Sequence, residues 1–255
     1  MYRPCTHGHE RGDGMSEHPQ PAGAESELPP PLELAARFRQ LQGGDINGAL
    51  CQLHEETLLL DLHIKPLQRG MKMAGLAVTW GAVLACHDPV PEDAPTYKTR
   101  YEIYDHIYPG SVLIYQPGGE MSSGHLGSLF GNMVAVRGAA GAVVDGNLRD
   151  SDGHLRIPNW CPFARNSSPL EAGYRIKWLE INVPVLMSGE LCRWIEVHPG
   201  DMVFGDGDGV IIVPRRLILP VLELAEQTNR REEEAEREYA AGKDPRDVME
   251  KYGVA

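Results

Sequence analysis

The sequence predicts a mixed α/β fold, in which parallel strands alternate with helices before the chain turns to short strands and a long final helix. An apolar strand at 111–116 is followed by a glycine turn, a helical period over 126–138 and a strand at 141–145. This order is typical of a right-handed parallel crossover unit. After residue 150 the apolar runs are short and bounded by turns, as in a β-rich segment. A long helical pattern begins at Pro214.

Length and charge limit the organisation and the partners of the chain. With 255 residues, the chain is long enough to bury a core, and we expect one domain with additions. Residues 1–30 are rich in Gly, Pro, His and Glu and predict a disordered tail. A central domain over 31–214 and C-terminal helices over 215–255 follow. The net charge of -12 would repel a polyanion, so we expect no nucleic-acid partner.

Cysteine usage and the absence of long apolar runs indicate a cytoplasmic protein. The five cysteines, at 5, 51, 86, 161 and 192, show no CxxC or other metal-ligand spacing, which favours reduced, buried thiols. No apolar run reaches the roughly 18 residues of a membrane span, and the N-terminus does not resemble a signal peptide. We therefore expect no membrane partner.

The N-terminal half predicts helices around one buried strand. In chain order we expect a helix from 31 to the glycines at 43 and 44, a helix capped by Asp45 through residue 51, a strand at 74–80, a proline-rich loop at 86–99, and a helix at 101–107.

The C-terminal part predicts strands and then helices. The strands are expected at 161–165, within 176–186, at 202–204 and at 210–213, and the last two frame the run 205–209. That run lacks the spacing and the terminal Glu of a calcium loop, so it predicts a hairpin turn. The apolar stripe of the final long helix fades near Thr228, and a charged extension continues to Glu238 before a short helix at 244–252.

The adjacent residues Arg149 and Asp150 follow the strand that begins at 141, which we expect to break at Gly146. An Arg side chain matches a carboxylate in bidentate geometry, and an Asp is a hard oxygen ligand for Mg²⁺ or Mn²⁺. The pair could therefore hold a 2-oxo acid against a metal ion. The alternative is a helix cap or a surface ion pair, which contributes little to stability.

Many short motifs follow one another along the chain in a fixed order and spacing. They are the strand at 75–79, Pro109-Gly110, Leu126-Gly127, Gly138, the run 141–146, Arg149-Asp150, the run 162–165, Ser168-Pro169, the run 182–185, the turn 199–201, and the run 205–214. In these motifs the chain from about residue 32 to 253 resembles the RraA-like family, which includes regulators of ribonuclease activity and class II 4-hydroxy-4-methyl-2-oxoglutarate aldolases.

The resemblance implies a swivelling β/β/α domain of RraA-like type with a C-terminal helical extension, assembled as a homotrimer or homohexamer with sites between subunits. It also implies a lyase that uses Mg²⁺ or Mn²⁺ and acts on a 2-oxo acid through an enolate. The reaction would be retro-aldol cleavage that releases pyruvate, or decarboxylation of oxaloacetate. The alternative within the family is a non-catalytic regulator that binds a protein partner.

Residue by residue, the resemblance implies that Asp150 is a metal ligand and that Arg149 binds and polarises the oxo acid. Backbone N–H groups of the loop formed by Gly127, Ser128, Leu129 and Phe130 would bind the substrate carboxylate. Aldolases of the family usually carry an acid where this chain has Ser128, and serine cannot take a proton at neutral pH.

Other acidic positions of the family are also altered or uncertain in register. Gly153 stands where many active members carry an acid, and Asp152, one residue earlier, is our second candidate metal ligand. From the C-terminal helix of a neighbouring subunit we expect Glu232 to reach the site. His125 and His154 flank the site in sequence and either could act as a base, although a structural role is commoner for such histidines.

Overall fold

The computed structural model describes residues 28–84, 98–173 and 175–253. The predicted disordered tail at 1–30 and the predicted loop at 86–99 lie almost entirely outside these ranges. The described chain forms the mixed α/β fold that the sequence predicts.

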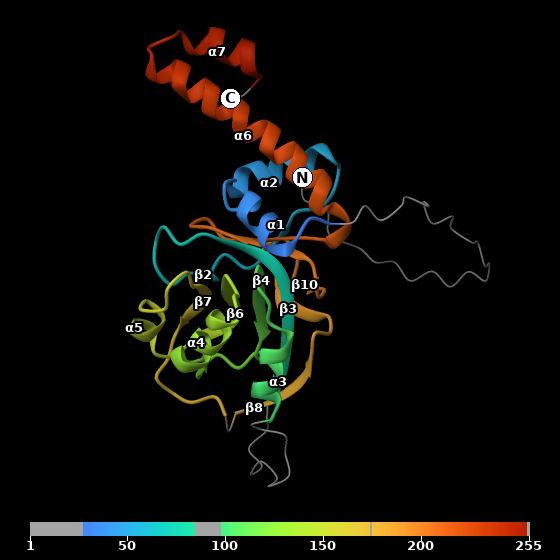
Figure 1. The fold of residues 1–255 in the computed structure, drawn as a ribbon, viewed down its shortest axis with the longest axis vertical. Coiled ribbons are helices and arrows are strands. Elements are labelled where there is room, and N and C mark those ends of the chain that lie inside the picture. The colour runs from blue at the N-terminus through green and yellow to red at the C-terminus, as the bar shows by residue number, and fades with distance from the viewer. Residues whose placement is uncertain (1–27, 85–97, 174, 254–255) are drawn as a thin grey trace, which may run out of the picture.

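A mixed sheet of ten strands forms the centre of the molecule (Figure 1). Its strand order is β1-β12-β11-β3-β4-β6-β7-β2, with β5 beside β6 and β8 beside β3. The four central strands β3, β4, β6 and β7 are parallel, which confirms the predicted parallel connection between the second and third of them. The bounds are β1 Leu58–Leu59, β2 Lys65–Pro66, β3 Met73–Leu84, β4 Ser111–Gln116, β5 Gly124–Leu126, β6 Gly141–Leu148, β7 Cys161–Ser167, β8 Ile176–Ile181, β11 Met202–Gly205 and β12 Val210–Val213.

The remaining elements are a separate hairpin and the helices. β9 Val185–Ser188 and β10 Trp194–Val197 pair as an antiparallel hairpin. The α-helices are α1 Pro31–Phe38, α2 Gly43–Gln52, α3 Lys98–His106, α4 Ser128–Val136, α5 Ser151–His154, α6 Ile218–Ala240 and α7 Pro245–Tyr252, with a 3₁₀ turn at Arg215–Leu217 before α6.

The central strands are buried on both faces, because alternate side chains pack into two different clusters. In β4, Leu113 and Tyr115 pack with Ile103 of α3 and Val134 of α4. Ile114 faces the opposite way and packs against residues of the β9–β10 hairpin. This arrangement follows from the two-residue period of a strand. The sheet therefore lies between a helical layer and a smaller β layer.

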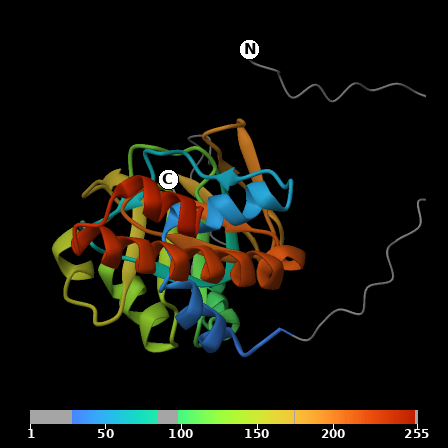
Figure 2. The same cartoon turned by 90° about the horizontal axis from the view of Figure 1, so that it is seen from above.

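A third apolar cluster joins α1, α2 and α6 to the antiparallel part of the sheet. Only the first half of α6 takes part, through Ile218, Val221, Leu222 and Ala225. The second half extends beyond the body of the molecule and packs against α7 (Figures 1 and 2). The predicted loss of the apolar stripe near Thr228 is thus confirmed. No helix among the described residues is both long and apolar enough to span a membrane.

Several details differ from the sequence predictions. The predicted break at Gly146 is wrong, because β6 continues through that glycine to Leu148. The glycines at 43 and 44 begin α2 instead of ending α1. Cys51 is exposed, so the expectation of buried thiols fails there. The strands β1, β2, β5 and β10 were not predicted. The first three have only two or three residues, which is too few to show a strand period.

The carboxyl group of Glu232 on α6 lies beside that of Asp45 on α2 within the same chain. Asp45 is buried and accepts hydrogen bonds from the Gln42 N–H at 2.7 Å and from Asn229 Nδ2 at 3.3 Å. Partial burial, together with the neighbouring Asp45 carboxyl, raises the pKa of Glu232. The contact between α2 and α6 therefore contains two acids that repel each other when both are ionised.

This carboxyl pair predicts a pH-dependent term in stability. Because the pKa of Glu232 is raised on folding, its favourable contribution is present below the ordinary glutamate pKa and is lost as the pH rises through the folded value. Glu232→Gln keeps a hydrogen-bonding side chain and removes the charge, so we expect Tm at pH 7.5 to rise. The rise should be only about 1–2 °C, because the Glu232 side chain is exposed and solvent screens the repulsion. Thermal unfolding of both proteins from pH 4 to 8 should show the gain only at the higher pH values. A gain of equal size at pH 4 would contradict it.

Candidate functional site

The candidate site is built at the carboxyl end of β6. β4 pairs with the first half of this strand, and β5 then takes its place beside Asn147 and Leu148. The Arg149 N–H continues the pairing by donating to the Leu126 carbonyl at 2.9 Å. Since α4 begins directly after β5, its first turn is brought against the residues that follow β6.

The first turn of α4 presents backbone donors to this point. Gly127 is the N-cap residue, and the first helical hydrogen bond runs from the Gly131 N–H to the Gly127 carbonyl at 2.9 Å. The N–H groups of Ser128, Leu129 and Phe130 precede that bond and have no carbonyl one turn earlier to accept them. The Ser128 N–H points toward Asp150 Oδ2 at 3.4 Å. Such a helix start favours a bound anion.

Gly127 leaves room for the charged pair to approach the start of the helix closely. A Cβ atom placed there would lie 3.2 Å from Asp150 Oδ2 and 3.3 Å from Arg149 Nη2. Both distances are tighter than ordinary van der Waals contact. A larger residue would therefore push the pair away from the helix start.

The backbone conformation and the exposure of Asp150 suit a metal ligand better than a structural ion-pair partner. Its φ of 62° and ψ of 49° lie in the left-handed region, which aspartate tolerates better than most residues. It occupies the N-cap position of α5, but its side chain makes no capping hydrogen bond. The side chain is 48% exposed, and Arg149 Nε lies 3.7 Å from its Oδ2. Lone pairs of this carboxylate are therefore available to a hard cation such as Mg²⁺ or Mn²⁺.

Arg149 lies between two carboxylates, one of which the sequence reasoning missed. Its Nε faces Asp150, and its Nη1 is 3.8 Å from Glu171 Oε1. Glu171 follows β7 in the segment before β8, and half of its side chain is exposed. Its position 22 residues after Arg149 left no spacing signal, since contacts between distant segments, among them a bridge between Glu171 and Gly124, bring it to the site.

Ser128 and Gly153 fill the positions where the family resemblance leads us to expect acids, and they are in direct contact. A Cβ atom added to Gly153 would collide with the Oγ and Cβ atoms of Ser128. The two small residues therefore depend on each other, because the serine occupies the space that a side chain at 153 would need. Neither can supply a carboxylate.

His154 has a structural role. Trp160 Nε1 donates to its Nδ1 at 3.0 Å, so the proton of the imidazole is on Nε2, which donates to the Leu126 carbonyl at 3.0 Å. Burial lowers its pKa, which favours the neutral ring that a hydrogen bond accepted by Nδ1 requires. Both nitrogens are engaged, and the side chain fixes the end of β5 instead of serving as a free base.

His125 is also enclosed. Its side chain has no exposed surface, and its Nε2 donates to the Glu120 carbonyl at 2.8 Å. Burial lowers its pKa, although the Glu120 carboxylate, 3.1 Å from the same nitrogen, opposes this shift. The ring is therefore inaccessible to a substrate.

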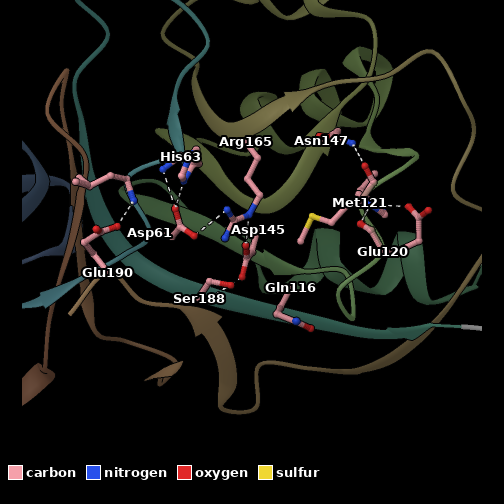
Figure 3. A network of polar contacts seen from close by, with 12 residues as sticks. Asp61, His63, Gln116, Glu120, Met121, Asp145, Asn147, Arg165, Ser188 and Glu190 are labelled. Atoms are coloured by element: carbon pink, nitrogen blue, oxygen red, sulfur yellow. Dashed lines mark hydrogen bonds and ion pairs between the residues drawn. The ribbon is translucent and has the colours of Figure 1, made fainter. Parts of the chain in front are cut away.

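On the face of the sheet away from the helical layer, a network of ion pairs holds the strands that lead to the site (Figure 3). Asp145 of β6 is buried and binds Arg165 Nε of β7 at 2.7 Å and the Ser188 N–H of β9 at 2.7 Å. Arg165 also reaches Asp61 Oδ2 at 2.9 Å. Burial opposes ionisation of Asp61, but hydrogen bonds from His63 and Arg165 outweigh it and lower its pKa.

Asn147 fixes the approach to β5. Its Nδ2 donates to the Met121 carbonyl at 2.7 Å and to the Ser123 carbonyl at 3.3 Å (Figure 3). Asp145 and Asn147 are both buried and lie two residues apart on β6. Their polarity within an apolar strand is a sequence signal that could have predicted this support.

The structure brings some of the predicted site residues together and leaves others apart. Arg149, Asp150 and the start of α4 from Gly127 meet at one place. Asp152 is exposed on α5, and Glu232 lies beside Asp45 of its own chain, so their predicted roles stay predictions. Within the described ranges, no three His, Cys, Asp or Glu side chains cluster closely enough to hold a metal ion. A cation here would have one or two protein ligands.

Fold and site together define an α/β protein with a half-exposed Arg–Asp pair facing the start of a helix, a site suited to a small anionic ligand. Residues 45–212 match the sequence profile of the RraA-like family, described as Aldolase/RraA. The chain belongs to this family.

Relatives and solved structures agree with this membership. A protein of Halalkalibacterium halodurans, provisionally named a 4-hydroxy-4-methyl-2-oxoglutarate aldolase, is 28% identical over 208 residues, covering 81% of this chain and 88% of the relative. A 4-hydroxy-4-methyl-2-oxoglutarate aldolase of Thermus thermophilus is 30% identical over 105 residues, 41% of this chain and 60% of the relative. Streptomyces coelicolor RraAS2, described as an unusual member of the RNase ES inhibitor RraA protein family, superposes with a TM-score of 0.67 at 23% identity, covering 83% and 98%. The predicted family and RraA-like fold are confirmed.

The contact between Ser128 and Gly153 predicts a coupled pair of substitutions. Gly153→Ala should lower the free energy of unfolding by about 1–3 kcal/mol, because the new Cβ collides with Ser128. In a Ser128→Gly background the same change should cost less, with a coupling of at least about 0.5 kcal/mol. Chemical denaturation of the four proteins of this cycle measures both values. Purely additive effects would contradict the contact.

Proposed function

We propose that this chain is a divalent-metal-dependent lyase that acts on a 2-oxo acid. It would release pyruvate by retro-aldol cleavage of a 4-hydroxy-2-oxo acid, or decarboxylate oxaloacetate, in both cases through an enolate. The observation that carries the proposal is the meeting of Arg149, Asp150 and the free N–H groups at the start of α4. The names of the aldolase relatives support the same class of reaction.

Different residues of the chain would bind different groups of the substrate. The N–H groups of Leu129 and Phe130, with the positive end of the α4 dipole, bind the substrate carboxylate. The Arg149 guanidinium donates to the oxygens of the oxo acid and stabilises negative charge that develops on them. The backbone that carries these donors is fixed, because the Arg149 N–H donates to the Leu126 carbonyl and the Gly131 N–H donates to the Gly127 carbonyl.

Mg²⁺ or Mn²⁺ would be held by Asp150, with Asp152 as the second candidate ligand. The carboxylate of Asp150 is half exposed and carries no capping hydrogen bond, which suits a hard cation. When bound, the metal supplies Lewis-acid stabilisation of the enolate charge.

The assembly proposed from the family resemblance is a homotrimer or homohexamer. The extension of α6 and α7 beyond the body of the molecule supports a contact with a neighbouring subunit (Figure 1). In that assembly Glu232 would approach the site of the neighbour. Its side chain would then have to leave Asp45, a contact weakened by repulsion between the two acids.

The lyase is tested with oxaloacetate and with 4-hydroxy-4-methyl-2-oxoglutarate in the presence and absence of Mg²⁺. We expect pyruvate release that EDTA abolishes. Asp150→Asn, which tolerates the left-handed backbone, should lower kcat/KM by about 100-fold or more through loss of the metal, and Arg149→Lys by a similar factor through loss of the bidentate donor.

Glu196→Gln, an exposed change on β10, is the matched control and should retain full activity. A coupled lactate dehydrogenase assay measures pyruvate from both substrates. Absence of metal-dependent pyruvate with both substrates would contradict the lyase.

A second candidate is a regulator that acts by binding a protein, as the RraA name of the Streptomyces relative implies for that protein. The net charge of -12 and the absence of a carboxylate at Ser128 favour it for this chain. Salt-sensitive binding to a basic partner that Asp150→Asn leaves unchanged, together with no lyase activity, would select this function.

A further inference from the structure

Within one chain, the proposed site lacks an obvious proton acceptor, because Glu232 lies beside Asp45 and away from Arg149. Retro-aldol cleavage requires removal of the proton from the C4 hydroxyl, and Ser128 cannot take it at neutral pH. We propose that Glu171 is the general base for this step. The inference rests on the proposed lyase function and concerns only its aldol branch.

Glu171 faces the residue that holds the substrate. Its Oε1 lies 3.8 Å from Arg149 Nη1, whereas Asp150 approaches a different nitrogen, Nε, at 3.7 Å. The two carboxylates therefore lie at separate positions around one guanidinium. A substrate oxygen bound by Arg149 comes within side-chain reach of Glu171.

The ion pair between Glu171 and Arg149 is too weak to give Glu171 a structural role. The Glu171 side chain is half exposed and the separation exceeds hydrogen-bonding distance. Exposed pairs of this kind contribute little to stability. The carboxylate is therefore free to exchange Arg149 for a substrate hydroxyl at little cost.

The backbone of Glu171 is nevertheless fixed beside the site. The Gly124 N–H donates to the Leu170 carbonyl at 2.9 Å, and a β-bridge joins Gly124 to Glu171. Ser168 Oγ donates to the Ser122 carbonyl at 2.7 Å. Because Gly124 begins β5, which leads directly to α4, Glu171 is anchored to the strand that positions the substrate-binding loop.

The other candidate bases near this point are less suitable. His154 has both nitrogens engaged, and His125 is fully enclosed. Asp150 is assigned to the metal. Gly153 carries no side chain, and a larger residue there would collide with Ser128. Among the described residues that contact Arg149, Glu171 is then the carboxylate left for proton transfer.

The step balances without a further reactant. The Glu171 carboxylate takes the C4 hydroxyl proton, the C4–O electron pair forms a carbonyl, and the C3–C4 bond breaks with its electron pair passing to C3. The products are a 2-oxo acid or aldehyde from C4 and the enolate of pyruvate. Protonated Glu171 then returns its proton to C3, which gives pyruvate and regenerates the base.

A comparison of the two substrates distinguishes a general base from a residue that binds the substrate or the metal. Decarboxylation of oxaloacetate breaks a bond to a carboxylate and requires no hydroxyl deprotonation. Glu171→Gln should therefore lower kcat for 4-hydroxy-4-methyl-2-oxoglutarate by about 100-fold or more, and kcat for oxaloacetate by less than about threefold. Glu171→Asp should recover part of the aldol activity. Arg149→Lys should lower both activities.

Binding of oxalate, a stable analogue of the pyruvate enolate, gives a measurement independent of turnover. Calorimetry with Mg²⁺ should give an oxalate Kd for Glu171→Gln within about threefold of that of the unchanged protein, since the base does not hold the anion. Glu196→Gln is the matched control for activity, binding and Tm.

Each outcome decides one point. Equal loss of both activities in Glu171→Gln, or a tenfold weaker oxalate affinity, would identify Glu171 as a positioning residue for Arg149 and overturn the inference. Unchanged aldol cleavage in the variant would overturn it as well, as would an unchanged protein that decarboxylates oxaloacetate but cleaves no 4-hydroxy-2-oxo acid. Inactivity of the unchanged protein toward both substrates would instead reject the lyase function.

Discussion

The pairing of β5 with the end of β6 is the constraint on which the site depends. The pairing ends in the hydrogen bond from the Arg149 N–H to the Leu126 carbonyl. Because only Gly127 separates Leu126 from α4, this hydrogen bond holds the first turn of the helix beside Arg149. Without this pairing the free N–H groups of the helix and the charged pair after β6 would lie on separate segments. Asn147 and His154 support it from two sides through hydrogen bonds to the backbone around β5.

The charges around Arg149 differ from those that the family resemblance leads us to expect. One guanidinium faces the carboxylates of Asp150 and Glu171, while two small residues in contact, Ser128 and Gly153, stand where acids are expected from the family resemblance. Loss of those acids leaves an anionic substrate with less repulsion. In the mechanism proposed above, proton transfer then falls to a carboxylate from a different segment, after β7.

The rest of the fold separates stability from function. The central strands are buried on both faces, and the network of Asp145, Arg165 and Asp61 lies on the face away from the helical layer. These groups hold the strands and need not touch a ligand. The second half of α6 has the opposite character, since it leaves the body of the molecule and carries charge on most of its surface.

From the sequence alone follow the order of the longer strands and helices, the hairpin at 205–209, the family, and the position of Arg149 and Asp150 directly after a buried strand. These features depend on local periodicity, on turn residues and on motif order, all of which are written along the chain. Only the tertiary structure showed Glu171 at the site and His154 locked between two partners. Contacts between distant segments depend on strand register and on side-chain direction, and neither leaves a signal in residue spacing.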